Sequence, residues 1–114
     1  MPFINAKTNL SLNTEIQSVL KTRLADAMSA SFPGKTENWL MIQFESASSM
    51  YFAGTDAPCM MVHMDIFGSQ SDAAYDKMTA AVCRIISEEC GIPADRIYVK
   101  YSEVEHWGWN GGNF

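Results

Sequence analysis

The two halves of this chain carry the same series of secondary-structure patterns, offset by about 58 residues, and this repeat constrains the fold more than any other feature. In each half a strand pattern comes first, an amphipathic helix pattern follows, and a second strand pattern closes the unit. The halves align at three points: Pro2 with Cys59, Asn13 with Ser71, and Trp39 with Ile97. The sequence therefore predicts two β-α-β units related by pseudo-symmetry.

Two helices are predicted because apolar residues recur at helical spacing. The first helix is expected over about 13–32, with Asn13 as its N-cap, and the second over about 71–90, ended by Gly91. Four strands are predicted over residues 2–8, 39–45, 59–67 and 96–103. A further tight turn is indicated by Asn110-Gly111.

These elements predict one α+β domain spanning residues 1–114, a two-layer α/β sandwich in which a four-stranded sheet carries two helices on one face. The other face of the sheet is then expected to be bare and apolar, so it needs a partner surface. Only 18% of the residues are charged, which also fits surface hidden in a subunit contact. Oligomerisation follows as an expectation, but these patterns leave the number of subunits open.

Composition excludes several classes of function. A net charge of −5 and the lack of a basic patch argue against nucleic acid as a partner. No apolar run approaches the roughly 20 residues that span a bilayer, and the first residues lack the features of a signal peptide. The cysteines, Cys59, Cys83 and Cys90, are odd in number and form no Cys-x-x-Cys, which favours free thiols in a reducing cytoplasm. Any export would use a non-classical route.

Pro2 follows the initiator methionine, and methionine is usually removed before a residue this small. Removal leaves a secondary amine, and an α-amine has an unperturbed pKa near 8. Desolvation or a nearby cation would lower that pKa and give a neutral base suited to proton abstraction beside a carbonyl. The alternative is that Pro2 has no chemical role, as in most proteins that begin Met-Pro.

Other candidate residues have functional and structural interpretations. Lys35 could bind a substrate carboxylate and lower the pKa of Pro2, or it could be a solvated loop lysine. Tyr98 and Lys100 share one face of a strand and could contact substrate, or could be surface residues. The three tryptophans could wall an apolar pocket or pack in the core: Trp39, Trp107 and Trp109.

The histidines do not predict a metal site. His63 and His106 lack the paired spacing of zinc ligands. His63 is interpreted as a buried or interfacial strand residue, and His106 as a turn residue. We expect no metal.

Five short segments occur together in a characteristic order and spacing: Pro2-Phe3-Ile4, Pro33-Gly34-Lys35, residues 53–59, residues 91–98, and Gly108-Trp109-Asn110-Gly111. With them, the chain resembles the macrophage migration inhibitory factor (MIF) family, which includes D-dopachrome tautomerase. The resemblance runs over the whole chain. It implies a homotrimer with active sites between neighbouring subunits, and it implies no cofactor.

The resemblance also implies an activity and site residues. The activity is a keto–enol tautomerase of the phenylpyruvate and dopachrome type, acting on small aromatic α-keto acids. Pro2 would be the general acid–base once Met1 is removed. Lys35 would come from the same subunit, with the backbone around Ile66 and Phe67, while Tyr98 would come from the next subunit. The tryptophans would wall the site.

Two departures from the family pattern matter for function. The run Cys59-Met60-Met61-Val62 lacks the second cysteine of the Cys-x-x-Cys found in the vertebrate cytokine, so no dithiol redox activity is predicted. Lys100 replaces an asparagine of the family's site strand. A second cation there would tighten carboxylate binding or change substrate choice.

Two other classes of function stay open. One is a secreted, cytokine-like ligand for a cell-surface receptor, with a vestigial or secondary pocket. The other is a non-catalytic trimeric binding module. If Met1 stays attached, the Pro2 nitrogen is an amide without a basic lone pair, and the proposed chemistry fails for that molecule.

Overall fold

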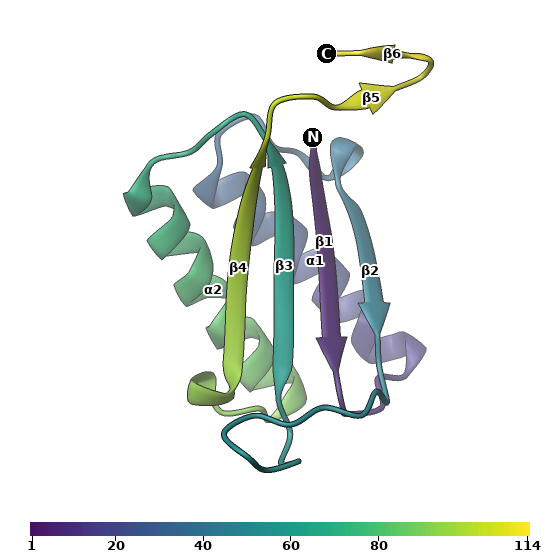
Figure 1. Ribbon diagram of the computed structural model, residues 1–114, viewed down its shortest axis with the longest axis vertical. Helices are drawn as coiled ribbons and strands as arrows, with labels where there is room; N and C mark the ends of the chain where they lie inside the picture. Colours follow the sequence, from purple (N-terminus) through teal and green to yellow (C-terminus); the bar gives the residue numbers. More distant parts are fainter.

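A computed structural model describes all residues, 1–114. The chain folds into one mixed sheet with two helices across one of its faces (Figure 1). The elements of the first half are β1 (Pro2–Thr8), α1 (Thr14–Ser31), the 3₁₀ turn η1 (Glu37–Trp39) and β2 (Met41–Glu45). Those of the second half are β3 (Met60–Phe67), α2 (Asp72–Cys90), the 3₁₀ turn η2 (Ala94–Arg96) and β4 (Ile97–Val104). A hairpin of β5 (Gly108–Trp109) and β6 (Gly112–Asn113) ends the chain.

The sheet has the strand order β2-β1-β3-β4 and confirms the predicted repeat. Each β-α-β unit contributes a parallel pair, β1 with β2 and β3 with β4. The units join through the antiparallel pair β1 and β3, in which Pro2 lies opposite Ile66. This topology brings the start of β1 and the ends of β3 and β4 to one edge, where β5 and β6 also lie (Figure 1).

The helices begin and end where side-chain chemistry predicts. The Asn13 side chain accepts a hydrogen bond from the backbone N–H of Ile16 at 2.8 Å, and the Ser71 hydroxyl accepts one from that of Ala74 at 3.1 Å. Gly91 ends α2 with a φ of 71°, a left-handed conformation that glycine adopts without strain.

Two strands start later than predicted because 3₁₀ turns precede them. The Trp39 N–H donates to the Thr36 carbonyl, so β2 starts at Met41. The Arg96 N–H likewise donates to the Pro93 carbonyl, so β4 starts at Ile97. Trp39 and Arg96 therefore belong to 3₁₀ turns and not to the strands.

The core fills the space between the sheet and the helices. Alternate residues of β1 and β3 face the helices and are fully buried, while α1 and α2 each present an apolar stripe. The largest fully buried side chains include Phe32, Leu24, Met28, Met64, Ile66, Met78 and Ile86. Four of the buried core residues are methionines, whose flexible side chains adapt to irregular space: Met28, Met60, Met64 and Met78.

The uncovered face of the sheet differs from expectation, because it is mixed and not apolar. Its apolar members are Phe3, Met41, Met61, Phe67, Tyr98 and Val104. Its polar members are Asn5, Lys7, Gln43, Glu45, His63, Asp65, Lys100 and Ser102. Alternation identifies the strand residues that face the core, but it does not fix the polarity of the residues between them that face outward. A partner for this face would therefore need polar complementarity.

Candidate active site

Pro2 lies at the edge of the sheet where the chain begins. It is the first residue of β1, pairs with Ile66 of β3, and is buried. The β5–β6 hairpin follows β4 at the same edge (Figure 1). The fold thus puts the amino-terminal end of the chain beneath its carboxyl-terminal segment.

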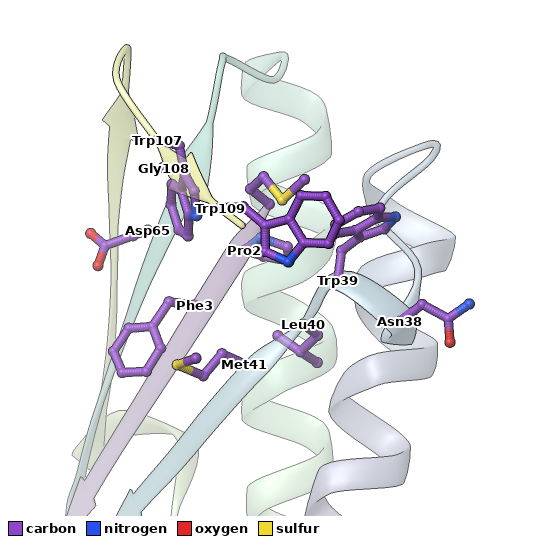
Figure 2. Close-up of a pocket in the computed structure, with 11 residues that line it drawn as sticks. Pro2, Phe3, Asn38, Trp39, Leu40, Met41, Asp65, Trp107, Gly108 and Trp109 are labelled. Atoms are coloured by element: carbon purple, nitrogen blue, oxygen red, sulfur yellow. The ribbon is translucent and has the colours of Figure 1, made fainter. Parts of the chain in front are cut away.

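A pocket of about 540 Å³ opens at this edge. Its walls are mostly apolar and come from β1, the segment around η1, β3 and the carboxyl-terminal segment (Figure 2). The lining residues are Met1, Pro2, Phe3, Asn38, Trp39, Leu40, Met41, Asp65, Trp107, Gly108 and Trp109. Apolar walls around few polar groups are typical of a small-molecule site.

Aromatic rings form one side of the pocket. Trp39 and Trp109 meet edge to face, with ring centroids 5.0 Å apart, and in Figure 2 the Trp109 indole is drawn across Pro2 with the Trp39 indole beside it. The Phe114 ring lies 6.0 Å from that of Trp39 and 5.8 Å from that of Phe67. The three predicted tryptophans thus all line the pocket, and the carboxyl-terminal phenylalanine joins Trp39 and Trp109 in one cluster.

Lys35 supplies a positive charge beside the amino terminus. Its ammonium group donates a hydrogen bond to the Phe67 carbonyl oxygen at 3.0 Å. Partial burial, together with repulsion from the Lys35 charge, lowers the pKa of the terminal amine of Met1 from 8.0 to about 6. An amine at this end of the chain is therefore largely neutral at pH 7.

The presence of Met1 has a direct chemical consequence. In the full-length chain the Pro2 nitrogen is part of an amide and cannot act as a base. The Phe67 N–H donates to the Met1 carbonyl oxygen at 3.0 Å, so the amide predicted to hold substrate is occupied. Removal of Met1 would free both groups.

The structure does not bring Tyr98 and Lys100 to the pocket of their own subunit. Tyr98 pairs with Met61 and Lys100 with His63, toward the other end of the sheet from Pro2. Lys100 lines a separate shallow hollow of about 200 Å³ on the uncovered face, together with Lys7 and His63. The Ile66 side chain is also outside the pocket, in the core, and only its backbone lies beside Pro2.

Sequence reasoning missed several residues that line the pocket, and Phe114, which packs on its wall: Phe3, Asn38, Leu40, Met41, Asp65 and Gly108. Phe3 and Asp65 could have been found, because they alternate with core residues and flank Pro2 across the β1–β3 pair. Phe114 carried only a weak signal, an aromatic residue just beyond an Asn-Gly turn. In Figure 2 the side chains of Asn38 and Asp65 point away from the middle of the pocket.

Other reactive groups do not form a second centre. His63 Nε2 lies 3.0 Å from Ser102 Oγ and 3.3 Å from Asp65 Oδ1. Because both contacts use the same ring nitrogen, they do not form a Ser-His-Asp relay. No three His, Cys, Asp or Glu side chains are grouped to hold a metal ion, and all three cysteines are free thiols. Neither helix has the length and apolar composition to cross a bilayer.

Comparisons with known proteins agree over the full chain. The family model described as "Macrophage migration inhibitory factor (MIF)" matches residues 1–114. The mouse macrophage migration inhibitory factor is 27% identical, covering 100% of this chain and 99% of that protein. D-dopachrome decarboxylase-B of Xenopus laevis is 29% identical, covering 97% of this chain and 95% of that protein.

Solved structures give the same result. The crystal structure of Leishmania major MIF2 matches with a TM-score of 0.93 and 33% identity, covering 100% of this chain and 97% of that chain. A macrophage migration inhibitory factor homologue from Prochlorococcus marinus matches with a TM-score of 0.88 and 29% identity, covering 98% of both chains.

Proposed function

Because this chain belongs to the macrophage migration inhibitory factor family, we propose that it is a keto–enol tautomerase whose general acid–base is Pro2 after removal of Met1. The observation that carries the proposal is the place of Pro2, which is buried, lines the apolar pocket and starts the chain beside Lys35. Burial and the Lys35 charge lower the pKa of the Met1 amine to about 6. Once Met1 is gone, the Pro2 nitrogen becomes the terminal amine and would meet the same two influences. A neutral amine under an apolar pocket is suited to remove a proton from the carbon next to a ketone.

The substrate proposed for this pocket is a small aromatic α-keto acid, such as phenylpyruvate. The aromatic ring would contact Trp39 and Trp109, and the carboxylate would lie near the Lys35 ammonium. The Phe67 N–H, freed of its bond to the Met1 carbonyl, would donate to the carboxylate or the enolate oxygen. Protonated Pro2 then donates the proton to the enolate oxygen, which completes the conversion of the keto form to the enol form. The reaction is a proton transfer and consumes no second substrate.

A complete site would require a neighbouring subunit. Met61, which pairs with Tyr98, and Ile66, which pairs with Pro2, are five positions apart on β3, so about 17 Å of strand lies between them. Tyr98 therefore cannot reach the pocket of its own subunit, but its exposed ring could enter that of the next. A homotrimer, consistent with this family, would supply that contact. Lys100 lies on the same face of β4 as Tyr98 and would then also lie near the neighbouring pocket.

Activity of the processed chain tests the proposal. Intact mass would establish whether Met1 is absent, and phenylpyruvate tautomerisation would be followed on the same sample, beside Pro2→Gly. We expect the processed wild type to turn over and Pro2→Gly to lose at least about a hundredfold in kcat/KM, the usual scale of general-base catalysis. A processed chain without activity, or a variant equal to wild type, would exclude Pro2 as the base.

Subunit mixing tests the shared site. Pro2→Gly keeps Tyr98, and Tyr98→Ala keeps Pro2, so refolding the two inactive variants together would create sites with both residues intact. We expect mixed trimers to regain activity that neither variant has alone. If co-refolded trimers of proven mixed composition stay inactive, Tyr98 does not serve the neighbouring pocket.

A second candidate is an extracellular signalling role, favoured because the relatives with full-length matches are named macrophage migration inhibitory factors. The protein would then be present in the cytoplasm, leave the cell by a non-classical route and bind a receptor outside it. A cell-migration assay with processed wild type and Pro2→Gly would separate the roles. Equal effects of the two proteins would support signalling that does not depend on the pocket chemistry.

A further inference from the structure

Arg96 makes a concentrated set of contacts at the edge of the sheet opposite the pocket. It ends η2, immediately before β4, and lies next to the turn-rich segment of residues 52–58. In Figure 1 the loop that contains this segment lies at the lower edge of the sheet, where β4 begins. Arg96 makes no ion pair, so its guanidinium is held in place by hydrogen bonds to neutral groups.

Four backbone carbonyl oxygens of the segment accept hydrogen bonds from the Arg96 guanidinium. Its Nε donates to Pro58 at 2.9 Å, and its Nη1 donates to Phe52 at 3.1 Å. Its Nη2 donates to Thr55 at 3.3 Å and to Ala57 at 2.9 Å. A planar group with several N–H donors is needed for this arrangement, and a lysine ammonium cannot reproduce it.

The same guanidinium also fixes the Phe52 ring. The Arg96 carbon Cζ lies 5.3 Å from the ring centroid, within cation–π range. Phe52 and Thr55 exchange two backbone hydrogen bonds, which close a tight turn through Ala53 and Gly54. The positive φ of Ala53, 52°, is unfavourable for an alanine and persists only if its surroundings hold the turn.

The Phe52 ring in turn supports Tyr98. The two ring centroids are 4.7 Å apart, and the Tyr98 side chain is otherwise largely exposed at 62%. An exposed tyrosine samples several rotamers unless a neighbour restricts it. Phe52 is therefore the group that limits where the Tyr98 hydroxyl can point.

We propose that Arg96 is a positioning residue for Tyr98: it fixes the turn at 52–58, and Phe52 of that turn orients the tyrosine that enters the neighbouring pocket. This inference rests on the proposed function, in which the Tyr98 hydroxyl contacts the substrate. Arg96 itself lies behind the turn and touches no reacting atom.

A double-mutant cycle tests the coupling. Arg96→Lys keeps the charge but loses the forked hydrogen bonds, and Tyr98→Phe removes only the hydroxyl. We expect each change to lower kcat/KM for phenylpyruvate about tenfold, the value of one well-placed hydrogen bond. The double variant should lose no more than either single variant, because without its hydroxyl Tyr98 needs no orientation. Arg84→Lys on the exposed surface of α2 is the matched control and should equal wild type.

Three results would overturn the positioning role. Arg96→Lys could leave kcat/KM unchanged, could lower it by the same factor with and without the Tyr98 hydroxyl, or could no longer assemble like wild type in sedimentation. The last two would give Arg96 a structural role only. Sedimentation and the thermal midpoint are therefore measured on every variant beside kinetics.

An inactive wild type would instead exclude the proposed tautomerase activity. A second measurement, which needs no substrate, then tests the positioning role of Arg96. The nuclear Overhauser contact between the Phe52 and Tyr98 rings reports the orientation without any substrate. Its loss in Arg96→Lys but not in Arg84→Lys would support the positioning role, and its retention in Arg96→Lys would overturn it.

Discussion

The Lys35 ammonium group donates a hydrogen bond to the Phe67 carbonyl oxygen at 3.0 Å, and this bond holds a cation beside the amino terminus of the chain. It joins the loop after α1 to the end of β3. Because Lys35 donates this hydrogen bond to a neutral carbonyl and not to a carboxylate, its charge is not cancelled. The charge therefore acts on the terminal amine, whose pKa it helps to lower.

Lys35→Met should move the acidic limb of the pH profile of kcat/KM to higher pH. Loss of the nearby cation raises the pKa of the Pro2 amine in the processed chain, so less of the neutral base is present in mildly acidic solution. We expect the loss of activity to be several-fold greater at pH 6 than at pH 8. Lys21→Met, which changes an exposed lysine on α1 paired with Glu37, is the control. An unmoved limb would contradict the electrostatic role of Lys35.

A chain that retains Met1 should become more stable as the pH rises from 6 to 8. The pKa of its terminal amine is about 6 in the folded chain and 8.0 without the fold, so in this window the unfolded chain binds more protons. The free energy of unfolding must then increase with pH. Urea unfolding of the full-length chain would be compared with an N-terminally acetylated chain, which lacks this titration. Parallel pH dependences of the two proteins would refute the prediction.

The sequence predicted the fold well because its signals were local and agreed with one another. Asn13 and Gly91 mark helix ends by their own chemistry, and each has the predicted role in the structure. The alternation over residues 39–45 predicts a strand that starts two residues too early, since the 3₁₀ turn at Trp39 depends on a backbone hydrogen bond that alternation cannot reveal.

The candidate site was less predictable, because its parts meet only through the tertiary fold. Pro2, Lys35 and the three tryptophans were named from the sequence, but Phe114 and Asp65 join them only because β3 and the carboxyl-terminal hairpin end at the same edge. The uncovered sheet face was predicted to be apolar and is mixed. Those outward positions face no core, so no packing requirement fixes their polarity.

Gly91→Ala should lower the free energy of unfolding by about 1 kcal/mol, the usual cost of a left-handed alanine. A Cβ at this position would meet no atom within 4 Å, so the cost comes from the backbone φ of 71° and not from a clash. Gly112→Ala is the matched control, because its surroundings are also open and its φ is not positive. Both would be measured by urea unfolding at one protein concentration. Equal costs would show that the conformation of Gly91 is not the cause.

Phe32→Ala should destabilise the chain by about 3–5 kcal/mol, the usual cost of truncating a buried phenylalanine. Phe32 is fully buried, and its ring meets those of Tyr75 and Tyr101 edge to face at 5.5 and 6.3 Å. Tyr51→Ala removes a ring that is 74% exposed and should cost less than about 1 kcal/mol. Thermal and urea unfolding would both be recorded. A small cost for Phe32→Ala would mean that the core refills the vacated space.

Phe114→Ala should weaken binding of aromatic α-keto acids about three- to tenfold, the range expected for loss of aromatic ring contacts. The Phe114 ring stacks at 6.1 Å on Trp109, which lines the pocket, and its backbone N–H donates to the Trp107 carbonyl. Because this contact holds the hairpin against the pocket and does not touch the base, KM should rise more than kcat falls. Quenching of tryptophan fluorescence by phenylpyruvate would give the affinity, and Tyr51→Ala, remote from the pocket, should bind like wild type. If kcat fell while affinity stayed constant, Phe114 would affect the chemical step and not the wall of the pocket.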